Sequence, residues 1–415
     1  MRFTEFTEEW ETKKLGEVME FKVTNFFSRE NLNYEIGTVK NIHYGDIHTK
    51  FQTLFDITNE IVPFINDEIN VVRISDENYC REGDVIFADA SEDLNDVGKS
   101  IEIINVNGEK LLSGLHTLLG RPKSSIFHLG FNGYLFKSNS VRTQIQKESQ
   151  GSKVLSINTR RISKIELSFP SVNEQEKITP LLSLLDERIQ TQNKIIKELN
   201  VLKATVTKRV FSCQLRFKDE NGNSFPEWEE KKLGEIAHIK SGLSKDQNCN
   251  SYGYKVTRIE TISDGTINLN KIGYIDFDGN IDDYKIKKGD ILLSNINSVS
   301  HIGKTAIAYF DLELYHGMNL LCIKSKYGLN PLFLYYYLNT VKIRNYFKSI
   351  CNQAVSQASI NQTELGKTMV VFPLLKEQTK IAEFLSSIDS KIDIEIQLLQ
   401  KLEGQKRFLL QQMFV

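Results

Sequence analysis

Residues 174–211 read EQEKITPLLSLLDERIQTQNKIIKELNVLKATVTKRVF, and their apolar side chains recur at steps of four and three. Such steps are typical of a helix that packs along another helix, whereas a strand would alternate at every second residue. The stretch therefore predicts one long helix over about 174–211. Its seam holds one polar residue, Gln192, and the apolar residues Ile178, Leu182, Leu185, Ile189, Ile196, Leu199, Val206 and Val210.

The same pattern returns 203 positions later, at the end of the chain. Glu377-Gln378 matches Glu174-Gln175, and Glu395 takes the polar seam position. Two helices with matching seams each need a partner, and each can be the partner of the other. We expect a second helix over about 377–414, with the apolar seam Ile381, Leu385, Ile388, Ile392, Leu399, Leu402, Leu409 and Met413.

Short motifs outside the helices are duplicated in the same order, which indicates an internal repeat. The matched motifs are Trp10 with KKLGE 13–17 and Trp228 with KKLGE 231–235, REGDVIF 81–87 and KKGDILL 287–293, GKS 98–100 and GKT 303–305, and SIN 156–158 and SIN 359–361. The offset between copies falls from 218 at Gly16 to 203 at Ser156, so the first copy carries 15 additional residues, 12 of them before Gly83. Loops absorb insertions, so each copy is expected to be a globular head followed by a long helix.

Within the heads, short β-prone runs lie between turn residues, and each head has one helical patch. The runs are 84–88, 99–106, 290–294 and 306–310, and the patches are 132–146 and 331–348. We therefore expect an α+β protein in which two mixed α/β heads are separated by two long helices, with an internal pseudo-two-fold repeat. The expected domains are the first head with its N-terminal segment (1–150), a connector and the central helix (151–212), a linker and the second head (213–355), and a connector and the C-terminal helix (356–415).

Two residues oppose the helical pattern. Pro180 removes a backbone hydrogen bond, so the first helix is expected to kink there or to begin afresh. Gly404 should cost the second helix ~1 kcal/mol relative to alanine.

Composition excludes several classes of protein. With 52 basic and 53 acidic residues the net charge is −1, which argues against indiscriminate adhesion to nucleic acid or anionic membrane. No run approaches the ~18 apolar residues of a membrane span, and the first 14 residues are too acidic for a signal peptide. The cysteines have no metal-ligand spacing and are expected to be free thiols: Cys80, Cys213, Cys249, Cys322 and Cys351. A cytoplasmic protein without a bound metal is expected.

Three motifs suggest an active site, but each has a simpler interpretation. The GK[ST] triplets lack the first P-loop glycine, since Asp93 and Ser298 occupy its position, and a strand-like run follows; a turn and a solvated lysine are favoured. Residues 330–333 (NPLF) resemble the NPPY/F loop of amino-methyltransferases, but a helix start is favoured. His43, His48 and Asp46 form a loose metal set that the second copy lacks. No acid–base residue recurs in both heads, so we expect neither catalytic nor cofactor-binding residues.

A polar loop follows the Gly-Asp strand in both copies, over 89–99 and 294–304. Ser, Asn and His side chains hydrogen-bond to base edges, and lysine neutralises phosphate; the alternative is that Ser/Asn-rich stretches are only loops. Further polar runs lie at 144–153 and 352–357. The candidate DNA contacts are Lys40, His43, Tyr44, Ser91, Asn95, Lys99, Lys147, Gln150, Lys153, Arg258, Ser294, Asn295, Asn297, Ser298, Ser300, His301, Lys304, Gln353 and Gln357.

Taken together, these residues resemble the specificity subunits of type I restriction–modification systems over essentially the whole chain. The resemblance is carried by FPEWEEKKLGEI (225–236), by KKGDIL and IGKTAIA (287–292 and 302–308), and by PLLKEQTKIAEFLSSIDSKI (373–392). Pro180 and Gly404 depart from the family pattern, in which the helices continue.

The resemblance implies two target-recognition domains on an antiparallel coiled coil, each of which reads one half of a bipartite, asymmetric DNA target. The helices would set the spacer and dock two methyltransferase subunits, and restriction subunits would complete the complex. S-adenosylmethionine, ATP and Mg would then be bound by the partners, and the chain itself would be non-catalytic. The alternative is a coiled-coil adaptor whose two heads bind proteins and have no DNA specificity.

Overall fold

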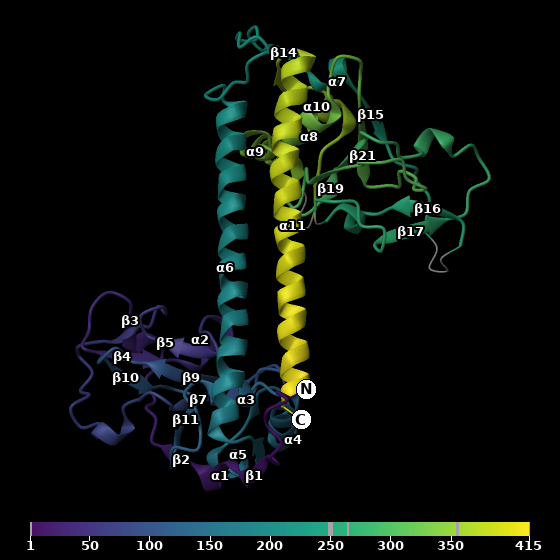
Figure 1. Ribbon diagram of the computed structural model, residues 1–415. Helices are drawn as coiled ribbons and strands as arrows, with labels where there is room; N and C mark the ends of the chain where they lie inside the picture. Colours follow the sequence, from purple (N-terminus) through teal and green to yellow (C-terminus); the bar gives the residue numbers. More distant parts are fainter. Residues whose placement is uncertain (1, 248–251, 264, 354–356, 415) are drawn as a thin grey trace. The chain divides into compact units, whose positions relative to one another are not determined.

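The computed structural model describes residues 2–247, 252–263, 265–353 and 357–414, and it divides into two compact units (Figure 1). Unit 1 comprises Met1–Lys194 and Gln397–Val415, and unit 2 comprises Ile195–Ile396. A compact unit therefore combines one head with parts of both long helices, rather than a head with the helix that follows it in the sequence.

The two long helices are α6 (Val172–Phe211) and α11 (Leu375–Met413), which confirms the helices predicted from the heptad pattern. In unit 1, Ile178 and Leu182 of α6 share an apolar cluster with Met413 of α11. In unit 2, Val210 of α6 clusters with Ile381 of α11. The start of each helix thus packs beside the end of the other within its own unit, so the pairing is antiparallel.

The predicted seam is buried along both helices. Gln192 and Glu395, the polar seam positions, are only 5% and 7% exposed. Most apolar seam residues are at most 9% exposed: Ile178, Leu182, Leu185, Ile381, Leu385, Ile388, Ile392 and Leu402. Val210 and Met413 are also buried, at 0% and 5% exposed. The remaining six are half-buried: Ile189, Ile196, Leu199, Val206, Leu399 and Leu409.

Helix α6 continues through Pro180, so the expectation of a new helix start there is wrong. The proline is exposed and stands in the ninth position of the helix. It removes the hydrogen bond to the carbonyl of Glu176, and Glu176 is also an exposed residue. Among the described residues, no helix is long and apolar enough to cross a bilayer.

Replacing Gly404 by alanine should stabilise α11 by about 1 kcal/mol, because alanine has the higher helix propensity and a Cβ at this position meets no atom within 4 Å. Urea unfolding of the whole chain measures the gain. Gly303→Ala is the control and should destabilise, since its φ is +71° and its Cβ would come within 2.7 Å of Phe347. Equal effects at the two positions would contradict this account.

The head of unit 1 is built on two sheets. The five-stranded sheet has the order β2-β11-β7-β9-β5, with β5 and β9 parallel, and the four-stranded sheet has the order β10-β4-β6-β3. Two short pairs, β1-β13 and β12-β8, complete the sheets. The strand bounds are β1 Glu11–Lys14, β2 Met19–Lys22, β3 Leu32–Asn33, β4 Val39–Ile42, β5 Leu54–Asp56, β6 Phe64–Ile65, β7 Val85–Ala88, β8 Ala90–Ser91, β9 Ser100–Asn105, β10 Lys110–Ser113, β11 Thr117–Pro122, β12 Leu155–Ser156 and β13 Glu166–Phe169.

The head of unit 2 repeats this plan with fewer strands. Its four-stranded sheet β15-β21-β18-β20 follows the order of β2-β11-β7-β9, and β14-β24 corresponds to β1-β13. The pair β16-β17 and the three strands β19-β23-β22 complete it. The strand bounds are β14 Glu229–Lys232, β15 Ala237–Ser241, β16 Tyr254–Thr257, β17 Ile272–Ile275, β18 Ile291–Ser294, β19 Ile296–Asn297, β20 Thr305–Ile307, β21 Leu320–Ser325, β22 Asn352–Gln353, β23 Ala358–Ser359 and β24 Met369–Phe372.

Short helices cover the sheets of both heads. Each predicted helical patch is in fact two helices, because Ser138 and Thr340 accept from Val141 N and Ile343 N and so cap a new helix. The helices are α1 Leu15–Val18, α2 Tyr44–Thr49, α3 Phe131–Leu135, α4 Asn139–Glu148 and α5 Thr159–Ile162 in unit 1, α7 Leu233–Ile236, α8 Pro331–Leu338, α9 Val341–Ile350 and α10 Gln362–Gly366 in unit 2, and the 3-10 turns η1 Arg29–Asn31, η2 Asp76–Asn78, η3 Ile259–Ile262 and η4 Asp282–Tyr284.

The repeated KKLGE motif forms a one-turn helix at the start of each head. Glu17 accepts from the backbone N–H of Lys14, and Glu235 accepts from that of Lys232. Leu15 and Leu233 are fully buried. The motif recurs because the turn needs both a buried anchor and a carboxylate that reaches back to its first residue.

The repeated Glu-Gln pair anchors each head to the start of its long helix. Gln175 accepts from His128 N and donates to the carbonyls of Ile126 and Pro170. Gln378 makes the equivalent three hydrogen bonds to Asn330 N, Gly328 O and Pro373 O. Both glutamine residues are fully buried, so the motif is structural.

Candidate nucleic-acid interface

The two predicted polar loops occupy equivalent places in the two heads. Each leaves the central strand of its main sheet, β7 or β18, and returns to the neighbouring strand, β9 or β20. Gly98 and Gly303 close the loops with φ of +65° and +71°, and their N–H groups bond to Ala88 O and Ser294 O. The GK[ST] glycines are therefore turn glycines before a strand, as predicted.

The two GK lysines have structural partners that the sequence did not predict. Lys99 Nζ donates to His48 O at 2.7 Å and lies 3.5 Å from Asp96 Oδ1. Lys304 Nζ donates to Ser263 O at 3.0 Å. Both side chains are half-buried, so the expectation of a solvated lysine is wrong. Lys99 thus ties the loop 89–99 to helix α2, and Lys304 ties the loop 294–304 to the end of the turn η3.

In unit 1, two of the predicted polar segments lie together. Arg142 of α4 donates to the carbonyls of Asn95 and Val97, so the loop 89–99 rests on α4. Strand β8 of this loop pairs with β12, and Gln150 bridges to Ser156. Ser91 is half-buried. The exposed candidate residues here are Asn95, Lys147, Gln150 and Lys153.

In unit 2, the equivalent loop is held by the second predicted polar run. Strand β19 pairs with β23, and β23 pairs with β22. Residues 354–356 of the polar run 352–357 lie outside the described residues, as does the side chain of Gln353, and Gln357 is exposed. The structure thus brings the loop 294–304 beside residues 352–353 and 357–359.

The exposed end of the unit 2 loop is a cluster of hydroxyl and imidazole groups. Ser298 Oγ and Ser300 Oγ each lie 2.9 Å from His301 Nδ1, and the two hydroxyls are 3.0 Å apart. All three side chains are exposed. Asn295 and Asn297 are half-buried and Ser294 is 1% exposed. Ser294 therefore supports the loop, and residues 298–301 form its outer surface.

Three other candidates lie in strand β4 and at the start of α2. His43 caps this helix, accepting from Gly45 N at 3.1 Å, and it is 7% exposed. Burial and the nearby Arg29 lower the pKa of His43 to about 4, so the ring is neutral at pH 7. Tyr44 is half-buried. Lys40 pairs with Glu109 at 2.6 Å, so the positive charge of Lys40 already has a counter-ion.

Arg258 of unit 2 lies at the position that corresponds to His43, before the 3-10 turn η3. Its side chain is half exposed and lies 3.4 Å from Glu260. Unlike His43, it faces solvent.

The sequence analysis missed His116, which lies beside the loop of unit 1. Its ring packs edge-on against Tyr44 at 5.3 Å between centroids, and its Nδ1 lies 3.3 Å from Asp89 Oδ1. Its φ of +56° is in the left-handed region, where only about a few per cent of non-glycine residues lie. Its counterpart is Asn319, also left-handed, so the two heads share the backbone conformation at this position but not the residue.

The two loops differ in charge. The loop 89–99 contains Asp89, Glu92, Asp93 and Asp96, whereas the loop 294–304 contains no acidic residue. Carboxylates repel phosphate but accept hydrogen bonds from the N4 amino group of cytosine. Near this loop of unit 1, exposed positive charge is offered by Lys147 and Lys153.

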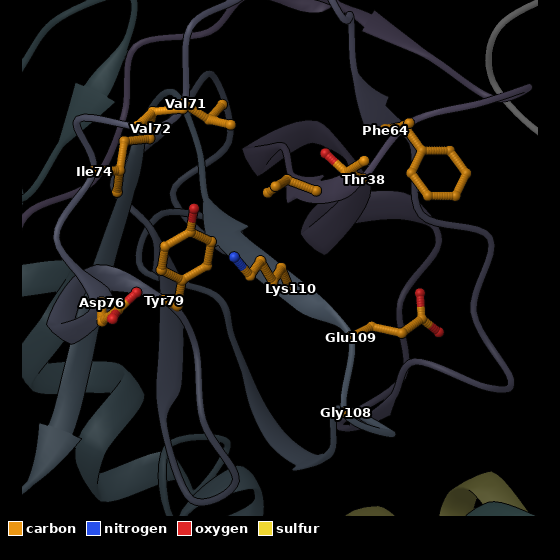
Figure 2. Close-up of a pocket in the computed structure, with 12 residues that line it drawn as sticks. Thr38, Phe64, Val71, Val72, Ile74, Asp76, Tyr79, Gly108, Glu109 and Lys110 are labelled. Atoms are coloured by element: carbon orange, nitrogen blue, oxygen red, sulfur yellow. The ribbon is translucent and has the colours of Figure 1, made fainter.

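A separate pocket of about 590 Å³ lies in the part of unit 1 that carries most of the additional residues of the first copy (Figure 2). Lys110 reaches over the Tyr79 ring, 5.6 Å from its centroid, and Val71, Val72 and Ile74 form an apolar wall. Neither polar loop contributes to its lining. It is therefore distinct from the candidate interface.

No metal site is found in the part of the chain that the structure describes, since no three His, Cys, Asp or Glu side chains gather there. Asp46 pairs with Arg29 and Lys50, and His43 is a helix cap. Asp46 and His43 of the suggested set therefore have structural roles. Cys80, Cys213, Cys322 and Cys351 are free, and Cys249 lies outside the described residues.

Comparison with known proteins identifies the family. The type I restriction modification DNA specificity domain matches residues 7–201 and 226–404. The protein named as the MjaX type I restriction enzyme specificity subunit of Methanocaldococcus jannaschii is 41% identical over 202 residues, which are 48% of each chain, so this match spans about half of the relative. The EcoKI specificity subunit of Escherichia coli is 22% identical over 390 residues, 86% of this chain and 82% of the relative.

A solved structure has the same fold. The S subunit of a type I restriction–modification system from M. genitalium aligns over 100% of this chain and 99% of its own, with 16% identity and a TM-score of 0.58. The chain therefore belongs to the type I restriction–modification DNA specificity family, with one specificity domain in each half. It is accordingly a specificity subunit with two target-recognition domains, and the adaptor alternative is not favoured.

Proposed function

We propose that each head reads one half of a bipartite DNA target, and that the chain is the non-catalytic subunit that directs a type I complex to this target in the cytoplasm. One observation carries the proposal. The two heads present a loop at the same place in the same sheet order, held by equivalent backbone hydrogen bonds, but with different side chains. Two equivalent surfaces of unlike chemistry suit two unlike half-sites.

The side chains of each loop suggest which contacts the heads make. In unit 2, Ser298, Ser300 and His301 offer exposed donors and acceptors for base edges in the major groove. In unit 1, Asn95 and the acidic side chains offer mainly acceptors, and the exposed Lys147 and Lys153 are the proposed phosphate contacts. A near-neutral chain would leave a share of the phosphate contacts to its partner subunits.

The long helices are the proposed docking surface for two methyltransferase subunits. In unit 1, Leu184, Leu398 and Phe408 are 43–55% exposed. In unit 2, Val201, Leu202 and Ile394 are 49–60% exposed. Apolar side chains left exposed on a helix pair suit the apolar face of partner helices. S-adenosylmethionine, ATP and Mg would bind to the methyltransferase and restriction subunits, and adenine flipping would take place there.

The test is adenine-methylation mapping in cells that express this chain with a cognate methyltransferase subunit. We expect a bipartite motif, and exchange of residues 16–150 for those of a relative should change one half only. Substituting alanine for Ser298, Ser300 and His301 together should relax or change the other half. Tyr327→Ser, at a fully exposed position outside the loop, is the control and should leave the motif intact. Absence of any motif with an active methyltransferase would refute the proposal.

A further inference from the structure

Each unit contains the same triad of side chains, drawn from its head and from both long helices. In unit 1, Tyr134 Oη of α3 donates to Asp186 Oδ2 of α6 at 2.9 Å. Lys406 of α11 pairs with the other carboxylate oxygen, Asp186 Oδ1, and its amine lies 5.8 Å from the centre of the Tyr134 ring. One carboxylate therefore joins the head to both helices.

Unit 2 repeats this triad with the roles of the helices exchanged. Tyr336 Oη of α8 donates to Asp389 Oδ2 of α11 at 2.7 Å. Lys203 of α6 pairs with Asp389 Oδ1, and its amine lies 5.9 Å from the centre of the Tyr336 ring. All three positions are thus matched across the repeat, in the same geometry.

The triad supplies a directional contact that apolar packing lacks. Tyr134 is fully buried and Tyr336 is 3% exposed. Apolar burial stabilises contact but is non-directional, so polar contacts are needed to fix how a head is turned on its helices. Gln175 and Gln378 hold each head at the start of one long helix, and the triad adds a contact that involves both helices. A phenol and an ammonium group on the two oxygens of one carboxylate fix the direction of approach, because hydrogen bonds weaken steeply when misaligned.

The surroundings also keep the phenol of each triad protonated. Burial and Asp186 raise the pKa of Tyr134, and burial and Asp389 raise that of Tyr336. Both phenols therefore remain donors at any pH the protein meets. Three residues after each triad tyrosine, the two heads have different side chains: Lys137 donates to Thr53 Oγ1 in unit 1, and Asn339 donates to Thr305 Oγ1 in unit 2. The triad is retained where neighbouring polar contacts have changed.

We propose that Tyr134–Asp186–Lys406 and Tyr336–Asp389–Lys203 are positioning triads that fix the orientation of each recognition head on the helix pair, and so determine how strictly the spacer between the half-sites is measured. The proposal rests on the proposed function. The triad residues are proposed to contact no base. A head whose orientation is held less firmly would still read the same half-site, but it would accept targets with spacers one base pair longer or shorter.

The test uses the full chain with its methyltransferase subunit and DNA duplexes that keep both half-sites of the mapped motif while the spacer varies by one or two base pairs. Tyr336→Phe removes one hydroxyl and keeps the ring. We expect the preference for the native spacer, measured as a ratio of methylation rates, to fall roughly tenfold or more, since one hydrogen bond to a charged group is worth a factor of about ten to a hundred. The half-site bases should stay the same, and Tyr134→Phe should behave alike.

Tyr335→Phe is the matched control, since this neighbouring hydroxyl makes only a 3.4 Å contact with Gly265 O, and it should keep the native ratio. Asp389→Asn provides a second variant that retains an acceptor and loses the charge, and it serves if Tyr336→Phe does not fold. An unchanged spacer ratio in folded variants, or a changed half-site, would overturn the positioning role. Failure of the wild-type chain to give a bipartite motif would instead refute the proposed function.

Discussion

Replacing Arg216 by alanine should lower the free energy of unfolding of unit 2 by about 3–5 kcal/mol, which is typical for breaking a buried ion pair. Arg216 Nη2 and Nε lie 2.8 and 3.1 Å from the two oxygens of Glu377. Its guanidinium group also donates to Phe225 O and Pro226 O. The glutamate side chain is 0% exposed and the arginine side chain 22%, so the variant leaves a carboxylate buried without its cation.

The reverse substitution should cost less. In Glu377→Ala the arginine that remains can reach water, because it is the more exposed partner. Hydrogen–deuterium exchange resolves the loss for each unit separately. The control is Lys231→Ala, whose ion pair with Glu229 is half exposed on both sides and should be worth well under ~1 kcal/mol. The expectation fails if Arg216→Ala is no more damaging than Lys231→Ala or than Glu377→Ala.

The second large effect concerns Glu102, which is 1% exposed in the main sheet of unit 1. Its two carboxylate oxygens accept from Gly130 N and Gly133 N at 2.8 and 2.7 Å, at the start of α3. Glu102→Ala leaves both N–H groups without this partner and should cost about 2–4 kcal/mol. Burial raises the pKa of Glu102 to about 7 from 4.5.

This raised pKa makes the stability of unit 1 depend on pH. Between pH 4.5 and 7 the folded state holds a proton that the unfolded chain has lost, so the stabilisation is fully present below pH 4.5 and is lost as pH rises through 7. Glutamine cannot titrate. The stability difference between wild type and Glu102→Gln should therefore shift by about 2.5 kcal/mol between pH 5 and pH 8, at 1.36 kcal/mol per pKa unit, with the wild type relatively more stable at pH 5.

Denaturant unfolding at pH 5 and pH 8 measures the shift, and hydrogen–deuterium exchange of the β9 amides reports the unfolding of unit 1. Glu92→Gln, at an exposed loop position, is the control and should show no comparable change. A pH-independent difference at Glu102 would contradict the assigned cause.

The sequence predicted the long helices and the repeat because both depend on regular spacing. The heptad seam, its polar positions Gln192 and Glu395, and the strands at the Gly-Asp motifs are all patterns of period or duplication. The break of each helical patch at Ser138 and Thr340 was not predicted, because a single capping residue is a weak signal inside a helical run.

The candidate interface was predicted less completely. The two loops and the adjoining polar runs do lie together within each head, but the roles of Lys99 and Lys304 depend on carbonyls 51 and 41 residues away. Such partners cannot be inferred from spacing. The Tyr–Asp–Lys triads combine residues from three segments of each unit, so they emerge only from the folded structure.

The composition of unit 1 has a consequence for the synthesis of the protein. Residues 397–415 belong to unit 1, whereas every residue of unit 2 lies between Ile195 and Ile396. On the ribosome, the unit that is begun first is therefore completed last. A chain that terminates just before residue 397 retains all of unit 2 and loses Lys406, Met413 and Phe414 from unit 1, so the damage of a late stop codon falls on the half of the molecule that was translated first.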